Sequence, residues 1–155
     1  WPVVVLVDIF RAVPPLALLI FISAGLPFAG IRLSPFMAVV LSFFLNNSAY
    51  YGEIIRAGIE SIGKGQHDAA RSTGLSAWQT QALRNVLPDL VSNTIEVVKL
   101  TSLASVVAFA ELLYAAEMAR SVTYNASPLV MAAAMYLVLL WPAVRLASGL
   151  EHKLR

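Results

Sequence analysis

The chain of 155 residues contains no cysteine. This absence excludes disulfide bonds, thiolate nucleophiles and metal sites built from cysteine. Charge is also scarce, because charged residues make up 13% of the chain, about half of the roughly 25% that is usual in soluble proteins. The formal net charge of +2 is too small to indicate nucleic-acid binding.

Apolar residues, in contrast, are abundant. They make up 59% of the chain, and the mean hydropathy is +0.74. A soluble domain of this size cannot hide so much apolar side chain, because its surface must be covered by polar groups. The composition therefore predicts an integral membrane protein.

A membrane-spanning helix needs about 20 mostly apolar residues to cross roughly 30 Å of hydrocarbon. Ser34 and Pro35 fit the start of one such helix. The predicted fold is a single all-α, polytopic transmembrane domain over residues 1–155, with a polar loop over residues 63–88. Its four expected spans are residues 12–31, 35–55, 95–118 and 127–147.

The distribution of Lys and Arg predicts the orientation. With four spans, both termini and the polar loop lie on one side of the membrane, and only Arg32 and Arg120 lie on the other. The positive-inside rule makes the first side cytoplasmic. The basic residues on that side are Arg11, Arg56, Lys64, Arg71, Arg84, Arg145, Lys153 and Arg155.

The polar loop contains a segment that can form one short helix, residues 66–73. Ala69 and Ala70 are small enough for close contact, and Asp68 is expected in the first turn, where a carboxylate interacts favourably with the helix dipole. Gly74 suits a left-handed position after the helix. The loop is either an ordinary solvated segment or a rigid lever gripped by a soluble partner, and composition alone favours the first interpretation.

Several motifs resemble those of ABC importer permeases. Residues 68–74 (DAARSTG) resemble the EAA loop, with Asp in place of Glu. Residues 8–16 (DIFRAVPPL) and 48–66 (SAYYGEIIRAGIESIGKGQ) resemble the ELFRGTPLL and SGAYxAEIxRGGIxSIxxGQ segments of polar amino-acid permeases. Residues 99–103 (KLTSL) and 110–112 (AEL) resemble KDTSL and AEL. The motifs cover most of the chain in the right order, and they favour the lever.

The resemblance implies a permease subunit of an ATP-driven importer for polar amino acids in the bacterial inner membrane. The implied partners are a cytoplasmic ATPase dimer, a second permease subunit (identical or a sister chain), membrane lipid, and an amino-acid-binding protein in the periplasm or outside the cell. The chain is not expected to be an enzyme or to bind a cofactor, because ATP and magnesium belong to the ATPase and no GxxxxGK[ST] loop is present. The implied ATPase contact comprises Gly65, Gln66, His67, Asp68, Ala69, Ala70, Arg71 and Gly74.

The chain departs from the family pattern in three places. The family has a helix upstream of residues 8–16, so we expect its first helix to be missing. A segment of roughly seven residues, about two helical turns, is absent between Thr80 and Gln81, which would shorten the lever. Leu100 replaces an Asp. A degenerate or non-transporting membrane scaffold is therefore an alternative function, and a secondary transporter is another.

Polar residues at membrane depth are candidates for the substrate path. Asn46, Tyr50 and Glu53 share one helical face. They either line a cavity for the ammonium and carboxylate of an amino acid or form hydrogen bonds between packed helices. The full candidate set is Asn46, Asn47, Tyr50, Glu53, Lys99, Thr101 and Ser102. Lys99 is expected to pair with Glu96, and Glu111 to lie near the outer water layer or to act as a gate.

Overall fold

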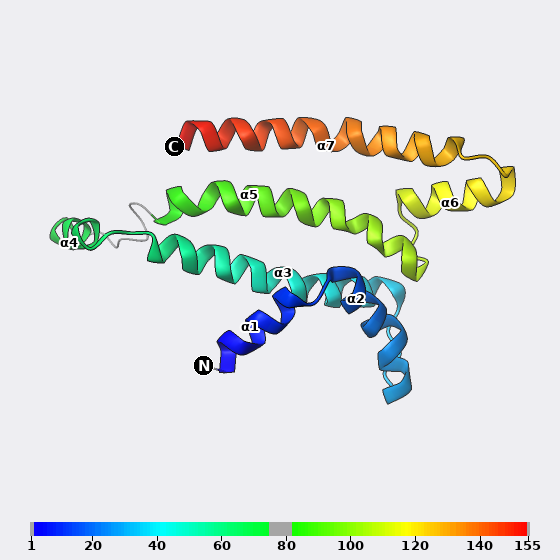
Figure 1. Ribbon diagram of the computed structural model, residues 1–155, viewed down its shortest axis with the longest axis horizontal. Coiled ribbons are helices and arrows are strands. Elements are labelled where there is room, and N and C mark those ends of the chain that lie inside the picture. The colour runs from blue at the N-terminus through cyan, green and yellow to red at the C-terminus, as the bar shows by residue number, and fades with distance from the viewer. Residues whose placement is uncertain (1, 75–81, 155) are drawn as a thin grey trace.

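The computed structural model describes residues 2–74 and 82–154, and every regular element in this part is a helix. The all-α prediction is therefore confirmed. Three long helices form a row in which α5 (Leu83–Leu100) lies between α3 (Pro35–Glu60) and α7 (Ser127–Leu154) (Figure 1). Two shorter helices, α1 (Pro2–Ala12) and α2 (Pro15–Ile20), pack on α3.

Helix α3 begins where the sequence predicts. The Ser34 side-chain oxygen accepts a hydrogen bond of 3.3 Å from the backbone N–H of Met37, and Pro35 occupies the first turn. A serine cap followed by proline is a favourable helix start. The helix continues past the predicted end at residue 55 and stops at Glu60.

The N-terminal region is a broken helix. After α2 the chain continues as a π-helical turn, η1 (Phe21–Gly25), and a 3₁₀ turn, η2 (Leu26–Ala29). This arm meets α1 at an angle of 98°. Pro14 and Pro15 have no N–H to continue the hydrogen-bond ladder of α1. The span expected over residues 12–31 is therefore only one arm of a sharply bent pair.

The third expected span, residues 95–118, is wrong as a single helix. Helix α5 begins at Leu83, continues as the 3₁₀ segment η4 (Thr101–Val107) and stops at Ala108, whose φ of 56° is left-handed. A separate helix, α6 (Leu112–Thr123), follows and packs on α7. The apolar run is Asn85–Val107, so the polar loop predicted over residues 63–88 ends earlier than expected.

Two helices of the described chain are long and apolar enough to cross a membrane, Asn85–Val107 and Ser127–Gly149. The bent pair of α1 and the arm ending at Ala29 adds a third if it is counted as one span. This is fewer than the four expected spans. Helix α3 is long enough to cross a membrane, but Asn46 and Asn47 in its middle lower its mean hydropathy.

The largest cluster of buried apolar residues lies where α2 and η1 pack on α3, and it comprises Leu18, Leu19, Ile22 and Ala38. Leu103 and Val107 of η4 also pack against it. Large apolar side chains elsewhere are exposed, as on α7, where Val138 is 71% and Leu146 is 76% exposed. Exposed apolar faces of this extent are typical of surfaces covered by lipid or protein.

Candidate functional site

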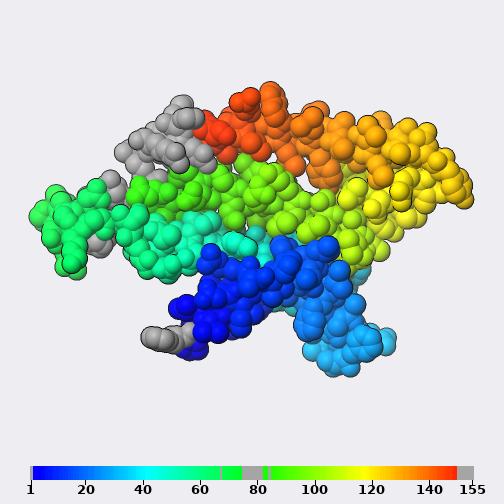
Figure 2. All heavy atoms as spheres, viewed as in Figure 1, coloured from blue at the N-terminus to red at the C-terminus, as the bar shows by residue number. Residues whose placement is uncertain are grey.

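The predicted contact motif lies on α4 (Lys64–Ser72), beyond the ends of α3 and α5 (Figure 1). In the space-filling view α4 protrudes from this end of the molecule (Figure 2). The helix begins two residues earlier than predicted, because Gly63 adopts an extended conformation and serves as its N-cap. The expectation that Asp68 lies in the first turn is therefore wrong, and the first turn contains no acidic residue.

The two alanines of the motif face different surroundings. Ala69 is exposed, whereas Ala70 is only 5% exposed and packs against Ile62 and Ala82. Of the two alanines, Ala69 is therefore the one that a partner can contact. The motif residues that share its exposure are Gly65, Gln66, Asp68, Arg71 and Gly74. The side chain of His67 lies outside the described residues.

Gly74 has a φ of +73°, in the left-handed region, as the sequence predicts. It follows Thr73, the C-cap residue of α4, and its backbone N–H donates to the Arg71 carbonyl oxygen at 3.2 Å. Residues with a side chain rarely adopt this conformation. The deletion expected between Thr80 and Gln81 lies outside the described residues.

Next to α4, the end of α3 and the start of α5 are in direct contact. A methyl group built on Gly58 would lie 1.8 Å from Cγ2 of Val86, so the two backbones approach closely here. The side-chain amide of Asn85 donates to the Ser61 hydroxyl oxygen at 3.1 Å. We call six residues the base of α4: Gly58, Ser61, Ile62, Ala82, Asn85 and Val86. Sequence reasoning missed the base, although a glycine inside a helix is a recognisable sign of close approach.

Asn46 connects α3 to the break between α1 and α2. Its side-chain amide donates to the backbone carbonyl oxygens of Phe10 at 2.9 Å and Val13 at 3.2 Å. The Tyr50 hydroxyl donates to the carbonyl oxygen of Arg11 at 3.1 Å. The contacts of these two side chains agree with the interpretation as hydrogen bonds between helices.

The proline pair explains why these carbonyls need partners. In an α-helix the carbonyls of Phe10 and Arg11 would accept from the N–H groups of the residues four positions later. Those residues are Pro14 and Pro15, which have no N–H. Asn46 is only 1% exposed, so its bonds are shielded from water.

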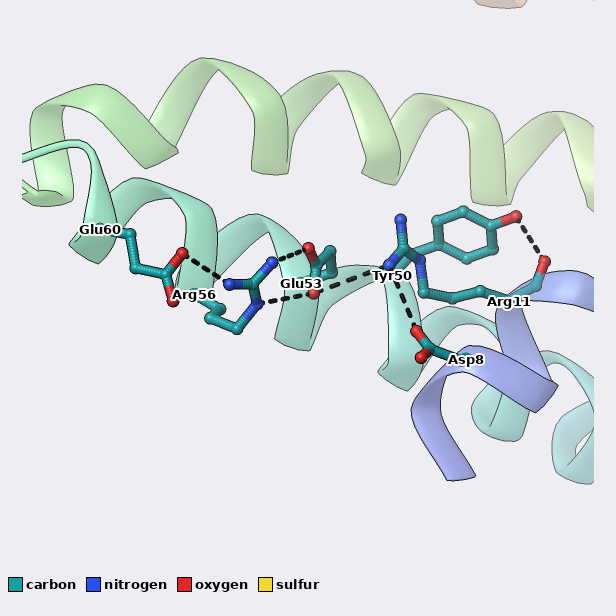
Figure 3. Close-up of polar contacts among 6 residues, drawn as sticks. All are labelled: Asp8, Arg11, Tyr50, Glu53, Arg56 and Glu60. Atoms are coloured by element: carbon teal, nitrogen blue, oxygen red, sulfur yellow. Dashed lines mark hydrogen bonds and ion pairs between the residues drawn. The ribbon is translucent and has the colours of Figure 1, made fainter. Parts of the chain in front are cut away.

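Glu53 lies in a row of alternating charges that joins α1 to the end of α3 (Figure 3). It pairs with Arg56 on its own helix and with Arg11 of α1, at 3.6 Å. Arg11 also lies 4.0 Å from Asp8, and Arg56 lies 2.6 Å from Glu60. The hydrogen bonds that the Arg56 side chain donates to Glu53 and Glu60 raise its pKa, so this guanidinium stays charged.

The remaining path candidates lie elsewhere. The amide of Asn47 donates to the Phe43 carbonyl oxygen within α3. Lys99 pairs with Glu96, as predicted, and lines a hollow of about 360 Å³ between α5 and α7. The hydroxyls of Thr101 and Ser102 donate to carbonyls one turn earlier. Among the described residues, no hydrogen bond or ion pair joins this group to Asn46 or Glu53.

Glu111 has a role that the sequence did not predict. It is the N-cap of α6, and its carboxylate accepts from the backbone N–H groups of Leu113 at 2.8 Å and Tyr114 at 2.6 Å. The Tyr136 hydroxyl of α7 donates to the same carboxylate at 2.7 Å. Glu111 therefore starts one helix and ties it to the next. The described residues contain no cluster of three or more His, Asp or Glu that could hold a metal ion.

The comparisons with known proteins agree on one family. Residues 1–155 match the family described as "binding-protein-dependent transport system inner membrane component". In Bacillus subtilis (strain 168), the probable amino-acid ABC transporter permease protein YckA is 39% identical over 73% of this chain, and the probable glutamine ABC transporter permease protein GlnP is 43% identical over 74%. These matches cover 53% and 56% of the two relatives, so the chain spans about half of their length.

Longer matches extend the likeness to almost the whole chain. The arginine transport system permease protein ArtQ of Bacillus subtilis (strain 168) is 32% identical over 96% of this chain and 72% of its own. A crystal structure of an amino acid ABC transporter with histidines superposes with a TM-score of 0.85 at 36% identity, over 96% of this chain and 73% of that one. The chain therefore belongs to the family of inner-membrane components of binding-protein-dependent transport systems.

Proposed function

We propose that this chain acts as a permease subunit of an ATP-driven importer and that α4 is its contact with the ATPase. One observation carries the proposal: the EAA-like motif forms a separate short helix that protrudes beyond the row of long helices (Figure 2). A helix in this place is accessible to a soluble protein, and its movement reaches the membrane helices through α3 and α5.

The proposed contact is the exposed side of α4, with Gln66, Asp68, Ala69 and Arg71. Ala70 takes a different part in the proposal. Because it is buried against Ile62 and Ala82, it fastens α4 to its base instead of meeting the partner. Closure of an ATPase dimer on bound ATP and magnesium would then push on α4 as a rigid body.

The positions of the helix ends and of the basic residues near them support a cytoplasmic location for α4. The N-terminal end of α1, α4 and the C-terminal end of α7 lie toward the same end of the molecule (Figure 1). Lys64 and Arg71 lie on α4, and Arg56 lies near the end of α3 that leads to it. Basic residues in this place favour the cytoplasmic side. A second permease subunit, identical or a sister chain, would cover exposed apolar helix faces. A binding protein would deliver substrate at the opposite end.

The proposed substrates are polar amino acids, because the similar proteins carry amino-acid, glutamine and arginine in their names. The amides and hydroxyl of Asn46, Asn47 and Tyr50 already bond to backbone carbonyls. We therefore propose that the path lies nearer Lys99, which lines the hollow between α5 and α7. Its ammonium is paired with Glu96 at an exposed site, and a substrate carboxylate would compete with Glu96 for it.

Uptake by a reconstituted transporter tests this function. The full permease, its ATPase and its binding protein from the same organism would be placed in proteoliposomes with labelled glutamine, arginine or leucine. We expect uptake of a polar amino acid that requires ATP and the binding protein. Uptake driven by a proton gradient without ATP would instead identify a secondary transporter, and an assembled complex without uptake would identify a scaffold.

A further inference from the structure

Helices α3 and α5 meet closely where Gly58 contacts Val86. Among the glycines of the described residues, Gly58 is the only one at which an added Cβ would lie less than 3.0 Å from another atom. A Cβ on Gly58 would be 1.8 Å from Cγ2 and 3.3 Å from Cβ of Val86. Val86 is 1% exposed, so its methyl group is enclosed at this point. Gly52 on the same helix has no atom within 4 Å of an added Cβ. The tight fit is therefore specific to Gly58.

This contact lies at the ends of α3 and α5 that are next to α4. Gly58 is in the last turn of α3, which ends at Glu60, and Val86 is in the first turn of α5, which begins at Leu83. Two neighbouring interactions hold the same two helix ends. Asn85 donates to Ser61, and Ala82 packs with Ile62 and Ala70 of α4. The base of α4 thus joins three helices.

The base supplies a short mechanical route from α4 to α5. Only Ser61, Ile62 and Gly63 separate α4 from α3, so a displaced α4 moves the end of α3 directly. Helix α5 contains the start of the apolar run Asn85–Val107. The displacement of α3 is passed to α5 at the contact between Gly58 and Val86. Closely packed helices transmit such shifts because they have little free volume to absorb them.

We propose that Gly58 is a positioning residue for coupling: its missing side chain seats Val86, so that α3 and α5 move together when α4 is displaced. The inference rests on the proposed function, because it assumes that an ATPase moves α4. Glycine is unfavourable inside a helix, and the close approach to Val86 provides the reason for its presence here. Small residues serve in the same way where membrane helices pack closely.

The test compares substitutions in the full transporter with its ATPase and binding protein in proteoliposomes. Gly58→Ala places a methyl group in the space that Val86 Cγ2 fills, so Val86 loses its seat on α3. Gly52→Ala is the matched control on the same helix. The measured quantity is the amount of amino acid taken up for each ATP hydrolysed. We expect Gly58→Ala to keep the ATPase bound but to lower this ratio by about tenfold, a usual size for coupling between sites. Gly52→Ala is expected to match the wild type.

The double variant Gly58→Ala/Val86→Ala decides whether the effect comes from this contact. It adds one methyl group and removes two others, and the closest remaining Val86 atom, its Cβ, is 3.3 Å from the new one. We expect the ratio to recover. If Gly58→Ala does not assemble, recovery of assembly and of the ratio in the double variant supports the inference, and failure to recover overturns it.

Three results distinguish failure of the inference from failure of the function on which it rests. Equal ratios for wild type, Gly58→Ala and Gly52→Ala would overturn the inference and leave the importer intact. Yield, ATP hydrolysis and uptake that fall in proportion would show a merely structural role and would also overturn it. Absence of ATP-dependent uptake by the wild type would overturn the proposed function, and the inference with it.

Discussion

The side-chain amide of Asn46 donates to the backbone carbonyl oxygen of Phe10 at 2.9 Å, although the two residues are 36 positions apart in sequence. Pro14 removes the N–H that would otherwise serve this carbonyl in a continuous helix. A residue in the middle of α3 therefore completes the end of α1. The sharp bend between α1 and α2 depends on a polar group from a different helix.

Replacing Asn46 tests this dependence. Asn46→Leu leaves the carbonyls of Phe10 and Val13 without a donor, in a place where Asn46 is 1% exposed. A buried polar group without a partner costs about 1–3 kcal/mol. We expect a clear fall in the midpoint temperature of unfolding in detergent. Asn47→Leu is the control, because its amide bonds to a carbonyl inside α3, and equal losses in the two variants would contradict the account.

Tyr50→Phe removes only one hydrogen bond from the same junction. The variant keeps the ring, over which the Arg11 guanidinium lies at 5.8 Å, but it loses the hydroxyl that donates to the Arg11 carbonyl. We expect a smaller destabilisation, of about 0.5–1.5 kcal/mol. Unfolding in detergent measures it. A loss larger than that of Asn46→Leu would contradict the account, because the Tyr50 hydroxyl, and not Asn46, would then be the main support of the bend.

Glu111→Ala removes the N-cap of α6 and its tie to α7 together. Loss of a capping side chain costs about 0.5–2 kcal/mol, so thermal stability in detergent should fall. Tyr136→Phe removes only the tie, because the carboxylate still accepts from Leu113 and Tyr114. We expect the tyrosine variant to retain more stability, and the opposite order would contradict the capping role.

Gly74→Ala tests the turn after α4. No atom lies within 4 Å of an added Cβ, so the only obstacle is the left-handed backbone, which costs an L-residue about 1–2 kcal/mol. We expect faster cleavage by protease near α4 and weaker binding of the ATPase. Gly149→Ala is the control: it also has open space and lies inside α7, outside the proposed contact, where alanine is favourable. Equal behaviour of the two variants would contradict this reason.

The sequence predicted those features that depend on local chemistry. Ser34 and Pro35 start α3, and Gly74 adopts its left-handed conformation, because a cap and a positive φ each require particular residue types. The spacing of Asn46, Tyr50 and Glu53 correctly placed them on one face of a helix, which faces α1. Their bonding partners were not predictable, since these belong to a different helix.

The misses have physical causes as well. The stop at Ala108 uses a left-handed residue that is not glycine, so no typical turn residue indicates it in the sequence. Glu111, in the expected span, was predicted to lie near the outer water layer or to act as a gate, and its role as a cap was not predicted. Ala69 and Ala70 look equivalent in the sequence. They differ only because α4 turns Ala70 toward Ile62 and Ala82, and the pattern of residues does not reveal which side of a short helix meets its own chain.

Co-purification of the ATPase with substituted permeases tests the central claim, that the exposed side of α4 is the ATPase contact. Ala69→Glu adds bulk and charge there without touching the buried Ala70. Ala119→Glu is the matched control, because Ala119 is also an exposed helical alanine, on α6 at the opposite end of the molecule (Figure 1). The account predicts that the ATPase is retained by the wild type and by Ala119→Glu and is lost from Ala69→Glu. Full retention by Ala69→Glu would contradict it.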